Sequence, residues 1–382
     1  MNSRLTQEQI ELRDAVRELA RERIAPRAAE IDQAGEFPRD IVELFAKHDV
    51  FALIYPPEHG GLGGTLLTNC LMIEEVSRVC ATSGLILAVQ ALGSLPLQLA
   101  GSDEQKRRWI PGLASGRLLN AFALTEAGAG SDSAGIRTRA VRDGDGWRID
   151  GTKRFISHGS EADLVAVLAV TDPEAGRHRD LSFFYVERGM AGFSVARLEH
   201  KMGIRGSPTA ELVFDGVRVP DANRVGEVGE GFRIAMQTLN RSRPGVAAQA
   251  VGIAQGALDV AVDYARQRVQ FGKPIGEHQM VQAMLADMAT RTEAARQLLY
   301  EACERIEGGA ADAARWAAMC KLFAGDTAMA VTTDAVQVLG GYGYITEYPV
   351  ERMMRDAKIT QLYEGTQQIQ RLVIARALLS AQ

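Results

Sequence analysis

The chain has 382 residues, 46% of them hydrophobic and 24% charged, which excludes a disordered or fibrous protein and predicts two or three domains with sizeable cores. With 43 Lys and Arg against 48 Asp and Glu the formal charge is -5, so no overall basic field favours nucleic acid or anionic lipid. The chain contains four cysteines without a CxxC pair: Cys70, Cys80, Cys303 and Cys320. We expect buried free thiols in a reducing compartment, not disulfides or zinc ligands.

The N-terminus reaches acidic residues at once and lacks the basic patch and apolar run of a secretory signal. A cytoplasmic protein is therefore expected. The longest uncharged stretch, residues 79–102, is 24 residues long and would suffice to span a bilayer, but Gly, Gln, Ser and Pro interrupt it. We expect this stretch to be a buried helix and no membrane contact.

Helical patterns dominate the first third of the chain. Thr6 and Gln9 have the spacing of a capping box, and the amphipathic run that follows is expected to end near Pro26. The hydrophobic periodicity predicts further helices at about 40–48, 65–80, 84–100 and 103–115. Residues 1–117 are therefore expected to form an N-terminal helical domain.

From Leu118 the pattern changes to short β-rich runs separated by Gly, Asp and Pro turns, which predict a central β-barrel or sandwich over residues 118–229. Long helices rich in Ala, Leu and Met follow at roughly 231–268, 278–307, 311–339 and 366–380, with loops at 270–277 and 340–349. Antiparallel helices with short connections form bundles. The predicted fold is an α+β multidomain protein that ends in a four-helix bundle over residues 230–382.

Several common site motifs are missing from the sequence. It contains no GxGxxG, P-loop, GxSxG or HxxxH string, so a Rossmann-type nicotinamide site, a serine hydrolase and a histidine-based metal site have no support. No metal is expected.

One candidate for acid-base chemistry lies near the C-terminus. Glu364 stands in TQLYEGTQQIQR, in an aromatic loop just before a helix opened by Thr366. Partial burial there raises the pKa of a glutamate above its usual ~4.3, as a general base acting on a weak carbon acid requires.

Three further segments give this residue a context: FALTEAGAGSD (122–132), GTKRFISHGSEADL (151–164) and RQRVQFGKPIGEHQ (266–279), beside QVLGGYGY (337–344). In these motifs, and in their order over nearly the whole chain, the protein resembles the acyl-CoA dehydrogenases. The resemblance implies a helical domain, a β-domain and a helical bundle, bound FAD, and a homotetramer built as a dimer of dimers.

The resemblance also implies the reaction, an FAD-dependent α,β-dehydrogenation of an acyl-CoA thioester to the trans-2-enoyl-CoA. Glu364 matches the base that removes the α-proton while the β-hydrogen leaves as hydride to flavin N5. In this family the backbone N–H of the base and a ribityl hydroxyl of FAD stabilise the enolate oxygen. Gly365 is expected to contact the substrate.

Flavin contacts are implied for two sets of residues by the same resemblance. The first set comprises Phe122, Leu124, Thr125, Gly130, Ser131, Phe155 and Ser157, with Ser131 also near the thioester. Phe155 and Ser157 replace a Trp-x-Thr pair, and Ala127 stands where Pro is common. The second set would hold the dinucleotide of a neighbouring subunit and comprises Arg268, Phe271, Gln337, Gly340 and Gly341. Thr366 and Gln368 match further FAD contacts.

Substrate contacts are implied for Asn240 and Arg243, although Asn240 stands where Asp often contacts CoA. Ser242 occupies the position at which some members carry their base. Family members that decarboxylate glutaryl thioesters have an arginine where this chain has Gly84, and stretch 79–102 carries no charge. Because this stretch offers no partner to a second carboxylate, we expect an uncharged acyl group. The small residues Gly84, Ala88, Ala91 and Gly93 leave room, and a short-to-medium or branched chain is expected.

Three alternatives stay open on the same scaffold. A flavin oxidase or nitronate-forming enzyme would typically carry Asp as its base. A non-catalytic flavoprotein or thioester-binding module would have lost the base or the flavin contacts. A dehydrogenase that acts on an acyl carrier protein presents the same pantetheine arm. The resemblance implies reoxidation by an electron-transferring flavoprotein, and the sequence leaves open the acyl chain, the pathway and the identity of the acceptor.

Overall fold

The computed structural model describes residues 5–176 and 178–380. Residues 1–4 of the predicted N-terminal domain (residues 1–117) lie outside the described part. Six α-helices form the N-terminal part: α1 (Gln7–Leu19), α2 (Ala28–Ala34), α3 (Arg39–Lys47), α4 (Leu66–Ser77), α5 (Ala81–Ala100) and α6 (Asp103–Ala114). The predicted capping box opens α1. Gln9 N donates to Thr6 Oγ1 at 3.2 Å, and Thr6 N donates to Gln9 Oε1 at 3.0 Å.

The expected helix end near Pro26 is wrong. The chain stays helical through a π-turn (Ala20–Ile24), a 3-10 turn (Ala25–Arg27) and α2. Pro26 lies in the first positions of the 3-10 turn, where its missing N–H costs no hydrogen bond. The helical run ends instead at Gly35, whose φ of 65° is left-handed.

The central domain is one mixed sheet. Its strands are β1 (Asn120–Ala123), β2 (Arg139–Asp143), β3 (Gly146–Ser157), β4 (Leu164–Val170), β5 (Leu181–Glu187), β6 (Phe193–Leu198), β7 (Thr209–Pro220) and β8 (Arg224–Val225). The order is β6-β7-β3-β2-β4-β5-β8, with β1 pairing parallel to β4. No pairing joins β6 to β8 within residues 5–176 and 178–380, so the predicted β-domain is an open sheet and not a closed barrel.

Both faces of the central strands are buried. Along β4, Leu164, Ala166 and Leu168 pack toward α5, α6 and α7, whereas alternate residues pack into a second core enclosed by β3 and β7. This burial explains why β4 reads as an uninterrupted apolar run in place of an alternating one.

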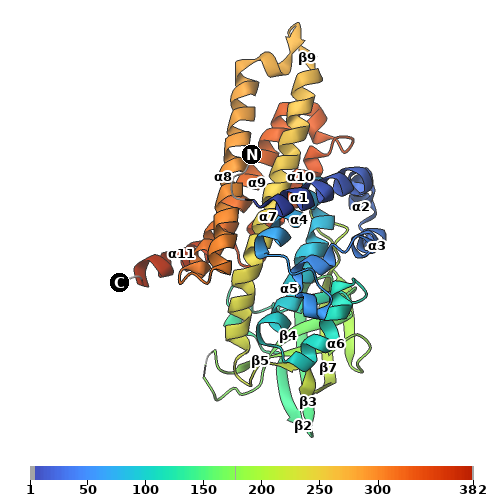
Figure 1. Cartoon of the computed structure of the whole chain (residues 1–382), viewed down its shortest axis with the longest axis vertical. Helices are drawn as coiled ribbons and strands as arrows, with labels where there is room; N and C mark the ends of the chain where they lie inside the picture. The colour runs from blue at the N-terminus through green and yellow to red at the C-terminus, as the bar shows by residue number, and fades with distance from the viewer. Residues whose placement is uncertain (1–4, 177, 381–382) are drawn as a thin grey trace.

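The C-terminal part is built on three long helices: α7 (Gly231–Gln267), α8 (Gln279–Glu307) and α9 (Ala313–Leu339). The expected loop at 270–277 contains a two-stranded hairpin, β9 (Val269–Gln270) with β10 (Lys273–Pro274), and lies at the far tip of the molecule from the β-domain (Figure 1). The expected loop at 340–349 begins as a 3-10 turn (Gly340–Tyr344). A helix that was not expected, α10 (Val350–Ala357), follows it. The last helix, α11 (Gln367–Ser380), packs on α9 and ends away from the body of the protein (Figure 1).

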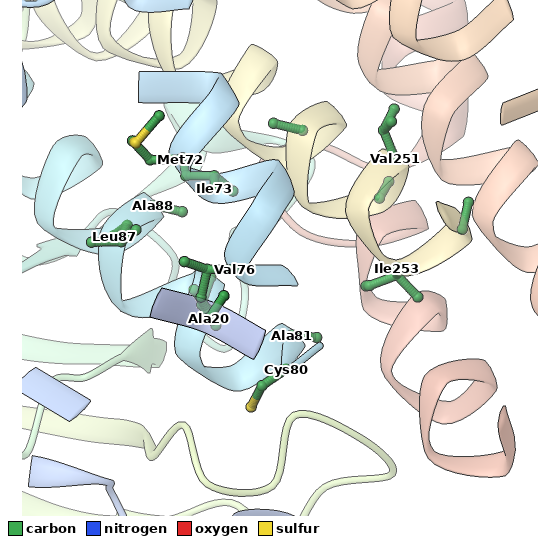
Figure 2. Close-up of a cluster of buried hydrophobic side chains, with 14 of the residues drawn as sticks. Ala20, Met72, Ile73, Val76, Cys80, Ala81, Leu87, Ala88, Val251 and Ile253 are labelled. Carbon is green, nitrogen blue, oxygen red and sulfur yellow. The ribbon is translucent and has the colours of Figure 1, made fainter. Parts of the chain in front are cut away.

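One hydrophobic core joins the N-terminal helices to the bundle. Ile73 of α4, Leu87 of α5 and Val251 of α7 belong to the same buried cluster (Figure 2). The uncharged stretch is a mostly buried helix, as expected. By length and composition alone, α5 and α7 pass a test for membrane-spanning helices, but most of each such segment is buried inside the protein, as core helices are. The four cysteines are free and buried.

Candidate functional site

Glu364 lies in the loop between a 3-10 turn (Lys358–Gln361) and α11. Its φ of 52° is left-handed, a conformation that is costly for a residue with a side chain and that often marks a functional position. Its carboxylate faces α7, where the Ser242 hydroxyl donates a hydrogen bond to Oε2.

The surroundings of this carboxylate favour proton uptake. Burial raises the pKa of Glu364, while the Ser242 hydrogen bond and the charges of Arg243 and Lys321 act in the opposite direction. A carboxylate whose pKa is raised is a stronger base, which suits the abstraction of a proton.

The backbone of the loop is held from three sides. Arg243 Nε donates to the Glu364 carbonyl at 3.4 Å, and Gln370 Nε2 donates to the same carbonyl at 3.2 Å. Lys321 Nζ donates to the Gly365 carbonyl at 2.8 Å. The Glu364 N–H donates no hydrogen bond within the described residues, so it is available to an oxygen atom of a ligand.

Four further predicted contact residues lie near the Glu364 loop, two for the substrate and two for FAD. Arg243 is buried and its Nη1 donates to Asn240 Oδ1 at 3.0 Å, so these two predicted substrate residues lie together beside the loop. Thr366 Oγ1 accepts from Ile369 N at 3.4 Å at the start of α11, and Gln368 is exposed on its first turn.

The first predicted flavin set gathers on the β-domain. Phe122 is on β1, Leu124 and Thr125 follow it, and Phe155 and Ser157 are on β3. Phe155 has a φ of 58° at a register shift between β3 and β7, and 57% of its surface is exposed. The bulge turns this aromatic ring outward. Gly130 and Ser131 are also exposed, and a Cβ built at Gly130 would meet no atom within 4 Å.

A buried ion pair holds the loop that follows β1 and contains Leu124 and Thr125. Lys153 Nζ is 2.9 Å from Glu126 Oε1 and donates to the Leu124 carbonyl at 3.0 Å. Burial lowers the pKa of Lys153 to about 8, so it is charged at pH 7. Partial burial acts to raise the pKa of Glu126, but the Lys153 charge and donors from Thr138 outweigh it and lower the pKa.

The second predicted set lies at the tip of the bundle. Arg268, Gly340 and Gly341 line a cleft of about 490 Å³, and the Arg268 guanidinium lies 5.2 Å from the centre of the Tyr342 ring. Phe271, in the hairpin loop, is 95% exposed. Gln337 is exposed on the last turn of α9.

The two predicted flavin sets lie at opposite ends of the molecule, with the β-domain at one end and the β9–β10 hairpin at the other (Figure 1). One chain therefore does not bring them together.

Two glycines expected to leave room for an acyl chain do not. A Cβ at Gly84 would lie 1.9 Å from Ser77 Oγ on α4, and a Cβ at Gly93 would lie 2.5 Å from Asn120 Oδ1. These glycines allow α5 to pack closely on α4 and β1. The expected room at Gly84 and Gly93 is wrong, because periodicity does not show which face of a buried helix meets another helix.

Three residues at the loop were not predicted to have a role. Ser242 was considered only as the site of an alternative base, yet its hydroxyl contacts Glu364. Gln370 and Lys321 hold the loop carbonyls. For Lys321 a signal was present, since it is the single charge in the apolar run AAMCKLFAG (317–325).

Comparison with known proteins supplies the family. Family models match residues 6–117, 121–217 and 229–379 as the N-terminal, middle and C-terminal domains of acyl-CoA dehydrogenases. An acyl-CoA dehydrogenase of Bacillus subtilis is 47% identical over 98% of this chain and 99% of its own. A cyclohexane-1-carbonyl-CoA dehydrogenase of Geobacter metallireducens is 49% identical over 96% of both chains.

A solved structure agrees with these sequence matches. Butyryl-CoA dehydrogenase from Megasphaera elsdenii is 41% identical and superposes with a TM-score of 0.96 over 99% of this chain and 100% of its own. With the domain matches, these similarities show that the protein belongs to the acyl-CoA dehydrogenase family of flavin-dependent oxidoreductases.

Proposed function

We propose that the protein catalyses the FAD-dependent α,β-dehydrogenation of an acyl-CoA thioester to the trans-2-enoyl-CoA, with Glu364 as the base. The observation that carries the proposal is the Glu364 carboxylate itself, which is enclosed beside Ser242 with a raised pKa and two cationic neighbours.

In the proposed reaction, Glu364 accepts the α-proton at a carboxylate oxygen. Ser242 orients the carboxylate through its hydroxyl, and Arg243 and Gln370 hold the loop carbonyl. The unpaired N–H of Glu364 is suited to bind the thioester oxygen, where negative charge develops as the α-proton leaves. The flavin, when bound, supplies the acceptor for the β-hydride.

The residues fit FAD if two chains share it. Open space lies over the backbones of Gly130, Gly340 and Gly341, which permits close approach of a ring or a phosphate. An arginine fork such as that of Arg268 suits a pyrophosphate. Because these contacts lie at opposite ends of one chain, a homotetramer in which each FAD bridges two subunits would complete the site.

We expect Arg268→Ala to lower both the flavin content and the stability of the tetramer, because the pyrophosphate would lose its charged partner between the chains. Flavin absorbance per subunit and size-exclusion chromatography measure the two effects. Arg266→Ala is the matched control, since Arg266 is exposed on the last turn of α7, two residues before Arg268, and pairs with Asp263 of the same helix. A colourless Arg268→Ala tetramer as stable as wild type would contradict the bridging role.

For the acyl group we propose an uncharged chain, short to medium, branched or alicyclic. Stretch 79–102 offers no charge to a second carboxylate, and a buried unpaired carboxylate would cost several kcal/mol. The relatives named for cyclohexane-1-carbonyl-CoA and butyryl-CoA support this class. Gly84 also has no space for the arginine of glutaryl-type enzymes, because its Cβ position meets Ser77.

For the electron acceptor we propose an electron-transferring flavoprotein, because the protein belongs to the acyl-CoA dehydrogenase family.

One experiment distinguishes a dehydrogenase from an oxidase and from a thioester-binding protein. Purified protein is mixed with butyryl-, isobutyryl-, octanoyl-, cyclohexanecarbonyl-, palmitoyl- and glutaryl-CoA in air, with and without an artificial electron acceptor. We expect turnover only with the acceptor. Peroxide formation that matches turnover would indicate an oxidase. If none of the tested thioesters bleached the flavin, the protein would not be a dehydrogenase for them. The same assay on the matching acyl carrier protein thioesters distinguishes the two carriers.

A further inference from the structure

Lys321 is a buried cation that the proposed reaction does not use. It lies on α9 and is fully buried. Its ammonium donates to the Gly365 carbonyl at 2.8 Å and to Gln367 Oε1 at 3.1 Å. Both acceptors belong to the segment that begins at Glu364, so this ammonium links α9 to the loop of the predicted base.

The charged groups around the loop come from several elements. Glu364 is faced by Ser242 and Arg243 from α7, by Lys321 from α9, and by Tyr363 of its own loop. Lys321 also interacts with Asp326, five residues further along α9. Arg243 and Lys321 are therefore the two positive charges that act on the Glu364 carboxylate.

A hydrogen bond alone does not explain a lysine at this position. The Gly365 carbonyl also accepts from Gln370 Nε2 at 2.9 Å, so a neutral donor already satisfies it. A buried ammonium pays a large desolvation penalty that a neutral side chain would avoid. Burial lowers the pKa of Lys321 to about 8, and Glu364 acts in the opposite direction. The side chain is thus still charged at pH 7.

We propose that Lys321 is a positioning residue for the base, whose ammonium fixes the Gly365 carbonyl and whose charge keeps Glu364 ionised in its enclosed site. The inference rests on the proposed function, because it assigns Lys321 a role through Glu364. Lys321 does not transfer a proton in it.

The test separates the charge from the hydrogen bond. Lys321→Gln keeps a donor for the Gly365 carbonyl but removes the charge, and Lys321→Arg keeps the charge. Gln370→Leu is the matched control, because it removes a neutral donor from the same Gly365 carbonyl. For each holoenzyme, the rate of flavin reduction by acyl-CoA is measured as a function of pH, together with thermal unfolding and flavin content.

We expect Lys321→Gln to move the acid limb of the pH profile upward by about one pH unit or more, the usual effect of losing a nearby opposite charge. Lys321→Arg should leave the limb near its wild-type position. Gln370→Leu should lower the rate without moving the limb. If Lys321→Gln does not fold, Lys321→Met is the second neutral variant and must show the same shift. A wild-type limb in the folded neutral variant would overturn the proposal, as would an equal shift in Gln370→Leu.

A second readout does not depend on turnover. The carboxyl C=O band of Glu364 in the infrared spectrum, identified by its loss in Glu364→Gln, titrates with the ionisation of this residue. In Lys321→Gln its midpoint should move upward with the kinetic limb. If Glu364→Gln reduced flavin normally, the proposed function would fail. The infrared midpoint would then still show whether Lys321 keeps Glu364 ionised.

Discussion

Glu364→Gln should keep its flavin and still bind the thioester, but reduce its flavin roughly a thousandfold more slowly or worse, the scale of a positioned general base. The amide has nearly the same shape as the carboxyl group and can still accept the Ser242 hydrogen bond. It cannot take up the α-proton at neutral pH. Anaerobic rapid mixing with acyl-CoA, followed at the flavin absorbance, measures this step alone.

The control for this substitution is Glu304→Gln, the same chemical change at an exposed position of α8. It should reduce flavin at the wild-type rate. A Glu364→Gln variant that behaved like this control would place the base elsewhere, and the geometry around Ser242 would then serve another purpose.

Lys153→Met is expected to cost about 3 kcal/mol of stability, as removal of one partner from a buried ion pair typically does. The methionine fills most of the volume, but the Glu126 carboxylate loses its cationic partner and the Leu124 carbonyl loses a donor. Since Leu124 and Thr125 are predicted flavin contacts, flavin retention should fall as well. Urea unfolding and flavin content before and after dialysis measure the two losses.

The double variant Lys153→Met with Glu126→Gln should recover part of the lost stability, because no unpaired charge is left buried. The glutamine Oε1 can still accept from Thr138 N and Oγ1, which bind Glu126 Oε1 in the wild type. If the single variant were as stable as wild type, the ion pair would contribute nothing to the loop. If the double variant were the weaker of the two, the cost would come from the Glu126 hydrogen bonds and not from charge.

Local sequence signals, such as hydrophobic periodicity and helix caps, predicted most of the helices and strands. The Thr6 capping box and the short β-rich runs are local features, and they correctly predicted helix α1 and strands such as β4. Pro26 misled because a proline ends a helix only where its N–H is needed, and in the first positions of a new turn it is not. Helix α10 was missed because its eight residues (VERMMRDA) are too few to establish a period against their charged neighbours.

The candidate site also contains residues that a local motif predicts and residues that it does not. The motif around Glu364 predicted it as the base, which stays a prediction, and burial raises its pKa in the expected direction. Lys321 and Ser242 lie 43 and 122 positions from Glu364 in the sequence. Only the packing of α9 and α7 around one loop brings them to it, and no local pattern records that packing. The crowding of Gly84 against Ser77 has the same origin, in contact between two helices.

The single core that joins α4 and α5 to the bundle has a consequence for biosynthesis. A ribosome adds roughly 5–20 residues per second, so α10, which completes this core, emerges on the order of 10 to 50 s after α5. During that interval Ile73 and Leu87, which are buried in this core, still await the partners that the bundle supplies. The nascent chain therefore displays apolar helices for most of its synthesis, and we expect it to engage chaperones cotranslationally and to aggregate when it is truncated before residue 357.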